Sequence, residues 1–235
     1  MRIAAVADLH CGVADRERIR ERLNALPADA DVLLIGGDLT NYGRPEELEV
    51  LISQLLRLRI PIITVLGNHD FESDAAPELL QRLRAVGIKT LDGEPYERDG
   101  VGFAGVKGFC GGFGRGELTA FGEPEIKRFV HAAMEESLAL ERALARLRNE
   151  RRVVLLHYAP IPETSVGEAR EIFPFLGSSR LADVCDRFGA TVIFHGHAHH
   201  GALEGRTRGG IPVYNVAQPL LMEQKPPQAF RMVAV

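Results

Sequence analysis

Short runs of β-branched and apolar residues recur along the chain, and early in the chain they alternate with segments of helical periodicity. The runs predict buried strands at residues 2–7, 31–35, 61–66, 101–106, 152–156, 191–194, 212–216 and 229–235. Apolar positions three and four residues apart predict helices at residues 15–26, 45–58, 76–86, 123–150 and 179–188. The alternation favours parallel strands, and the closer spacing of strands after Val101 favours a mixed sheet.

The composition is typical of one globular domain. Of the 235 residues, 46% are hydrophobic and 26% are charged, and no segment divides the chain into comparable halves. We therefore expect a single domain over residues 1–235. The net charge of −4 argues against a stable nucleic-acid partner, because such binding depends on a basic surface. Three widely spaced cysteines, with no signal-like or long apolar segment, favour a cytoplasmic protein without membrane attachment.

Acidic, amide and imidazole side chains follow five predicted strands, at the ends where open α/β sheets form ligand crevices. They are Asp8, His10, Asp38, Asn68, His157, His197 and His199. Mixed oxygen and nitrogen donors suit manganese, iron or zinc, and their number suits two divalent ions. In extended backbone, Asp8 and His10 would share one face, and the same spacing lets His197 and His199 share an ion or bind different ones. Gly196 is expected to allow a sharp backbone turn.

The motifs occur in a characteristic order: Asp-x-His at 8–10, Gly-Asp at 37–38, Gly-Asn-His-Asp at 67–70, a histidine at 157 and Gly-His-x-His at 196–199. In this order they resemble the calcineurin-like metallophosphoesterase superfamily. The resemblance implies an α/β (α+β) fold with two mixed β-sheets packed as a sandwich flanked by helices, in four αββα layers. The Gly-Asp motif lacks the second Asp-Arg signature of protein serine/threonine phosphatases, so the chain looks more similar to the small bacterial phosphodiesterase-like branch.

The resemblance also implies which side chains hold the ions. One ion would be bound by Asp8, His10 and His199, the other by Asn68, His157 and His197, and Asp38 would bridge the two.

Two ions at such a site supply charge neutralisation and a metal-bound hydroxide, which is the expected nucleophile. The leaving alkoxide also needs a proton. His69 is the candidate catalytic acid, because it adjoins Asn68 without being one of the family's ligands, and Asp70 is expected to orient its ring. The expected substrate is a small soluble phosphodiester or nucleotide-type phosphate ester. A nuclease-like phosphodiesterase and a non-catalytic metal-binding scaffold are the alternatives.

Other residues have plain structural explanations. His131 and His195 are expected to do no chemistry, whereas His200 adjoins the metal motif and could face substrate. The glycines at 108–116, with Arg115, fit a phosphate cradle, a mobile lid or a plain hairpin. Cys11 is expected to be a structural thiol, since no base is paired with it in the sequence. The basic run at residues 16–22 alternates with glutamate and predicts a solvated helix face.

Overall fold

The computed structural model describes residues 1–235 and contains two mixed β-sheets. The first has the strand order β11-β1-β2-β3-β4 and comprises β1 (Arg2–Val6), β2 (Val32–Gly36), β3 (Ile62–Val65), β4 (Lys89–Thr90) and β11 (Arg231–Ala234). The second has the order β5-β6-β7-β8-β10-β9 and comprises β5 (Tyr96–Arg98), β6 (Val101–Val106), β7 (Arg151–Leu156), β8 (Val192–His195), β9 (Glu204–Arg206) and β10 (Pro212–Asn215). The edge strands β5, β9 and β11 are antiparallel to their neighbours, and the other strands pair in parallel.

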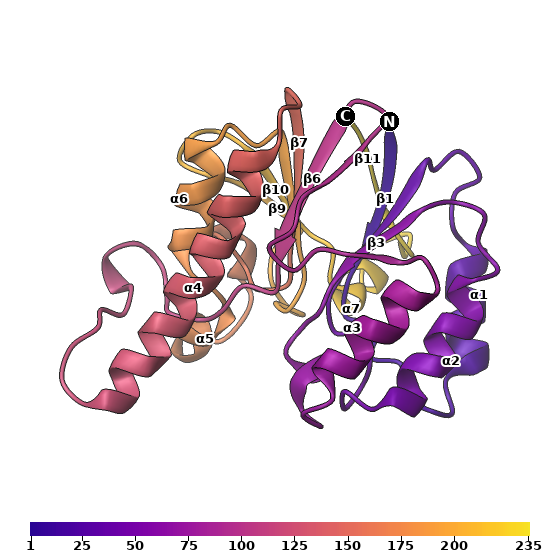
Figure 1. The fold of residues 1–235 in the computed structure, drawn as a ribbon, viewed down its shortest axis with the longest axis horizontal. Helices are drawn as coiled ribbons and strands as arrows, with labels where there is room; N and C mark the ends of the chain where they lie inside the picture. The colour runs from indigo at the N-terminus through magenta and orange to yellow at the C-terminus, as the bar shows by residue number, and fades with distance from the viewer.

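Helices cover the outer face of each sheet. Figure 1 shows α1 (Arg16–Asn24), α2 (Pro45–Leu55) and α3 (Ala76–Ala85) on one side of the molecule, and α4 (Pro124–Arg146) and α6 (Ser179–Arg187) on the other. One apolar core joins the two sheets, where Phe103 and Phe194 are buried in the same cluster as Ile35. A second core lies between the second sheet and its helices, and Leu144 and Leu181 belong to it. The expected four-layer αββα arrangement is therefore confirmed.

The expected elements agree closely with the structure. Each of the eight predicted strands is present with its ends shifted by at most two residues, and the long helix ends at Arg146 instead of residue 150. The strands and α-helices that were not predicted are β4, β5, β9, α5 (Phe173–Leu176) and α7 (Gln218–Met222), all of which have five residues or fewer. Such short elements carry too little periodicity to be recognised.

None of the helices combines the length and the apolar character that crossing a bilayer requires.

Candidate metal centre

The polar residues that follow the predicted strands meet where the two sheets adjoin. Asp8 and His10 follow β1, Asp38 follows β2, and Asn68 follows β3, so the first sheet supplies four of the side chains. The second sheet supplies three, namely His157 after β7 and His197 and His199 after β8. The carboxyl ends of parallel strands thus converge from both sheets on one site.

The acidic and imidazole side chains fall into groups whose ligand atoms can hold a cation. The first group is Asp8, His10 and His199, the second is Asp38, His157 and His197, and the third is His10, Asp38 and His69. Within each group the ligand atoms lie within 4.8 Å of one another. The histidines of the Gly-His-x-His motif therefore belong to different groups.

Left-handed backbone, not an extended strand, presents four of these side chains. The φ angles are 58° at Asp8, 42° at His10, 47° at Asp38 and 71° at His197. The extended conformation expected for Asp8 and His10 is therefore wrong, although both side chains still reach one group. A non-glycine residue in this region costs about 1–3 kcal/mol, and such residues persist only where the surrounding structure holds them.

Glycines beside the ligands allow very close packing. A Cβ atom at Gly67 would overlap Oδ1 of Asp38, and one at Gly196 would overlap Oδ2 of Asp8. The backbone does turn sharply here, since the N–H of Ala198 donates to the carbonyl oxygen of Gly196 at 2.8 Å, but His197 and not Gly196 has the positive φ angle of this turn. What Gly196 provides is room for the Asp8 carboxylate, which accepts hydrogen bonds from the backbone N–H of His197 at 3.0 and 3.1 Å.

Acceptor atoms converge around His157. Its Nδ1 lies 2.9 Å from the carbonyl oxygen of Gly36, and a carbonyl can only accept, so Nδ1 carries the proton. Nε2 then presents a lone pair toward Oδ1 of Asn68 at 2.8 Å and Oδ1 of Asp38 at 3.4 Å. His157 and Asp38 are buried and Asn68 is half-buried, and acceptors that face one another in such a place fit a cation between them.

The charge balance of the site also fits a cation. Burial, together with the charges of Asp8 and Asp70, raises the pKa of Asp38 to about 9, so an ionised carboxylate at this position requires a positive charge beside it. Burial lowers the pKa of His10 to about 4 and that of His157 well below its usual value. Both imidazoles are therefore neutral, which is the form that binds metal ions.

Asp70 does not contact the His69 ring, which it was expected to orient. The Asp70 carboxylate accepts hydrogen bonds from the backbone N–H groups of Leu39, Thr40 and Gly67, and from the Thr40 hydroxyl. It therefore joins the loops that carry Asp38 and Asn68, and the expected contact with the His69 ring is wrong. The Nδ1 of His69 instead lies 2.9 Å from the carbonyl oxygen of Asn41 and 2.9 Å from Oε1 of Glu72.

Two positioning contacts were not predicted. Arg18 donates to the carbonyl oxygens of Leu9 and His10 at 3.1 and 2.7 Å, so this residue of the basic run fastens the loop after β1 and is not merely solvated. The carbonyl oxygen of Phe175 lies 3.2 Å from Nε2 of His197, which leaves Nδ1 of that ring for a metal. Spacing along the chain could not reveal either contact, because each joins segments that meet only through the fold.

The remaining histidines and Cys11 have the surroundings of structural or surface residues. His195 is buried, and its Nε2 lies 2.8 Å from the Thr164 hydroxyl. His131 and His200 are exposed, and the backbone N–H of His200 donates to Glu168. Burial raises the pKa of the Cys11 thiol to about 12, which removes it as a nucleophile at neutral pH.

The glycine-rich loop at 108–116 is docked onto the segment before α6. The backbone N–H groups of Gly111, Gly112 and Gly114 donate to Pro174, Gly177 and Ser179 at 2.8 to 2.9 Å, so these amides are not free to cradle a phosphate.

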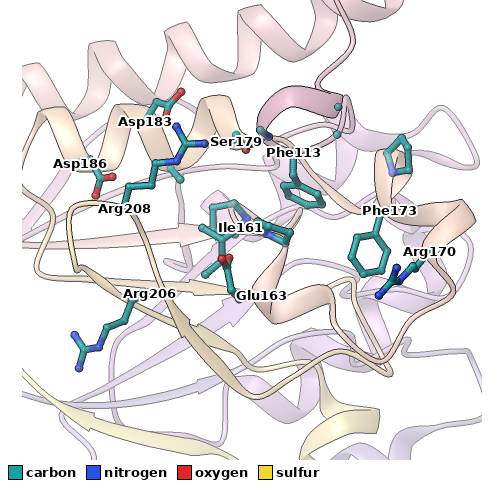
Figure 2. A pocket seen from close by; sticks show the side chains of 17 residues that line it. Phe113, Ile161, Glu163, Arg170, Phe173, Ser179, Asp183, Asp186, Arg206 and Arg208 are labelled. Carbon is teal, nitrogen blue, oxygen red and sulfur yellow. Dashed lines mark hydrogen bonds between the residues drawn. The ribbon is translucent and has the colours of Figure 1, made fainter.

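The loop also lines a cavity of about 390 Å³, which Figure 2 shows with Phe113 and Phe173 in its wall. None of the seven predicted ligands lines this cavity, so it is separate from the metal centre.

Comparisons with known proteins agree with the geometry of the site. A family model for calcineurin-like phosphoesterases matches residues 1–201. A segment of 63 residues is 40% identical to the glycerophosphodiester phosphodiesterase GpdQ of Enterobacter lignolyticus (strain SCF1), covering 27% of this chain and 22% of that protein. A segment of 106 residues is 30% identical to the uncharacterized protein YpbG of Bacillus subtilis (strain 168), covering 43% of this chain and 39% of that protein. The matches thus span less than half the length of these curated relatives.

Solved structures share the fold over nearly the whole chain. The protein TT1561 of Thermus thermophilus superposes with a TM-score of 0.59 and 16% identity, covering 99% of this chain and 97% of that chain. GAP50, the anchor in the inner membrane complex of Plasmodium, superposes with a TM-score of 0.57 and 12% identity, covering 93% of this chain and 72% of that chain. At such identities these neighbours support the fold alone.

Proposed function

This chain belongs to the calcineurin-like phosphoesterase family, and we propose that it is a metal-dependent phosphohydrolase acting on a small phosphodiester or a nucleotide-type phosphate ester. The observation that carries the proposal is the convergence of Asp38, Asn68 and His157, whose acceptor atoms face one another as the ligands of one cation would. The printed name of the relative GpdQ, a phosphodiesterase, supports a diester as substrate.

We assign two divalent ions to the site. One would be held by Asp8, His10 and His199 and the other by Asn68, His157 and His197, with Asp38 between them; the first two acid and histidine groups agree with this division. When bound, such ions neutralise phosphoryl oxygens and lower the pKa of water. The imidazole-rich donor set favours manganese, iron or zinc over magnesium.

Besides the metal ligands, the chain supplies a proton donor for the leaving group. The contacts of His69 Nδ1 with the Asn41 carbonyl and Glu72 leave Nε2 as the nitrogen that can face a leaving group. The His69 ring lies 4.6 Å from the His10 ring, which places it at the edge of the proposed centre. We therefore assign to His69 the protonation of the leaving alkoxide.

Removing and restoring the metal tests the proposed function. Protein stripped by a chelator should not hydrolyse bis-nitrophenyl phosphate or nitrophenyl phosphate, and manganese, iron or zinc should restore turnover more effectively than magnesium. The ratio of the two rates ranks diester against monoester. Stripped protein that binds two ions again but hydrolyses neither ester would instead support the non-catalytic scaffold.

Replacing His69 with alanine tests the proton donor. An alkyl leaving group needs protonation and nitrophenolate does not, so His69→Ala should slow alkyl esters about a hundredfold and nitrophenyl esters far less. Steady-state kinetics on both ester classes measure this difference, with the Glu72→Gln variant as a control that retains the imidazole. Equal losses on the two classes would show that His69 does not supply the proton.

A further inference from the structure

The helix α1 contacts the loop that carries Asp8 and His10 through Arg18 in its first turn. The helix is anchored by Ile19 and Leu23, which are buried in the core that joins the two sheets. Arg18 is half-buried and directly precedes Ile19, so its side chain extends from a firmly packed part of the helix. It therefore has a fixed base from which to act on the loop.

The guanidinium of Arg18 binds the backbone on both sides of His10. Nη1 donates to the carbonyl oxygen of Leu9 at 3.1 Å, and Nη2 donates to that of His10 at 2.7 Å. These carbonyls belong to the two peptide units that flank the Cα atom of His10. Because the guanidinium is a rigid planar fork, it holds both carbonyls at a fixed separation. Arg18 thus restrains the two backbone dihedral angles of a proposed metal ligand.

The same two peptide units are also bonded on their N–H side. The N–H groups of His10 and Cys11 donate to the carbonyl oxygens of Asp38 and Leu39, each at 3.0 Å. Each peptide unit beside His10 is therefore hydrogen-bonded at both ends. The φ angle of His10 is 42°, a conformation that a residue other than glycine keeps only where its surroundings hold it. Arg18 supplies half of the bonds that hold it.

Asp15 orients Arg18 and does not cap the helix that it begins. Asp15 is the N-cap residue of α1, where an aspartate commonly accepts a hydrogen bond from the first turn, but its side chain makes no such bond. Instead its Oδ1 accepts from Nε of Arg18 at 2.9 Å, and its Oδ2 accepts from the N–H of Gly12 at 2.7 Å. A local rule given up in this way is typical of a functional position.

The positive charge of Arg18 does not explain its place beside a metal site. A guanidinium repels a nearby cation, so its charge alone would weaken metal binding. Any benefit to a bound ion must therefore come from the geometry that Arg18 imposes on the loop.

We propose that Arg18, oriented by Asp15, is a positioning residue for one of the two proposed ions, the one assigned to Asp8, His10 and His199. The inference rests on the proposed function, which assigns that ion. Without the fork, the backbone of His10 can leave its left-handed conformation and carry the ring away from the other two ligands. Losing an outer contact of this kind lowers metal affinity by about 10- to 100-fold.

Calorimetric titration of the metal-free protein with manganese measures the dissociation constants of both ions. Arg18→Met keeps an unbranched stem and removes the fork, so one constant should rise at least about tenfold and the other should change less than about twofold. The affected constant should be the one that His199→Ala raises and Asn68→Ala does not. Arg18→Lys keeps the charge without the planar fork and should weaken the same ion.

The matched control is Arg20→Met. Arg20 lies on the same helix and pairs with Glu17 without a hydrogen bond to the loop, so both constants should stay at their wild-type values. Asp15→Asn removes the charge that orients Arg18 and should raise the same constant as Arg18→Met; it carries the test if Arg18→Met does not fold.

The direction and the selectivity of the change decide the outcome. Tighter manganese binding in Arg18→Met would show that Arg18 acts through its charge, and unchanged or equally raised constants would show that it does not position one ion. Each of these results would overturn the inference. A merely structural role would lower the unfolding temperature of metal-free Arg18→Met and leave both constants unchanged. Hydrolysis of bis-nitrophenyl phosphate by the manganese-loaded wild type shows separately whether the proposed function stands.

Discussion

Replacing Asp38 with asparagine is expected to lower kcat/KM for phosphoester hydrolysis by about 10⁴-fold, because the shared carboxylate is the charge that both ions need. Asp38 belongs to two of the three acid and histidine groups, more than any other acid of the site. The amide keeps the shape of the side chain but removes its negative charge. Metal analysis of the purified variant, together with rates for bis-nitrophenyl phosphate, measures both consequences.

Asp183→Asn provides a matched control for this result. Asp183 is an exposed aspartate on α6, outside the metal groups, so the same chemical change there should leave both metal content and rate unaltered. If Asp38→Asn retained two ions and more than about a tenth of the wild-type rate, Asp38 would not bridge the ions in the way we propose.

The second large effect is expected on stability, from replacing Asp70 with asparagine. Each oxygen of the Asp70 carboxylate accepts two hydrogen bonds, and three of the four donors are backbone N–H groups that cannot accept. An amide must therefore direct its NH₂ group against two backbone N–H groups in one orientation and against the Thr40 N–H in the other. In a fully buried position this change should cost about 3 kcal/mol of the free energy of unfolding. For a chain of this length that corresponds to about 6–12 °C in the unfolding temperature.

Urea and thermal unfolding in the presence of a chelator measure the cost without a contribution from bound metal. Asp74→Asn is the control, because Asp74 is exposed and its φ angle of 58° is one that asparagine tolerates well. An Asp70→Asn variant as stable as the control would mean that the two ligand loops do not depend on this carboxylate.

Much of the fold could be predicted because its long elements are apolar and regular. The strand at Val101–Val106 is buried at every position, and its predicted and observed bounds coincide. The edge strand Glu204–Arg206 is instead polar and three residues long, so nothing in its pattern separates it from a turn. The packing of both sheets through one core was expected from the family resemblance alone. The periodicity of apolar residues predicts each helix or strand separately and does not say how the sheets pack.

Part of the candidate site could likewise be predicted from the sequence, and part could not. The sequence indicated which side chains converge, because each follows a buried strand, but it misjudged the backbone of Asp8 and His10, whose left-handed conformation no propensity predicts. It also assigned Asp70 to its neighbour His69, although the carboxylate binds loop amides some thirty residues away in the chain. Contacts of that kind depend on how the strands are ordered in the sheet.

The pairing of β1 with β11 has a practical consequence for handling this protein. The terminal amine of Met1 donates to the carbonyl oxygen of Val235 at 2.8 Å, and the backbone N–H of Val235 donates to the carbonyl oxygen of Met1 at 2.9 Å. Residues 1 and 235 are therefore neighbours (Figure 1). Asp8 and His10 follow the opposite end of β1. Attaching the protein to a bead or sensor at residue 1 or residue 235 therefore leaves the loops that carry the proposed metal ligands toward solution, and the fold should tolerate a short peptide that joins these two residues.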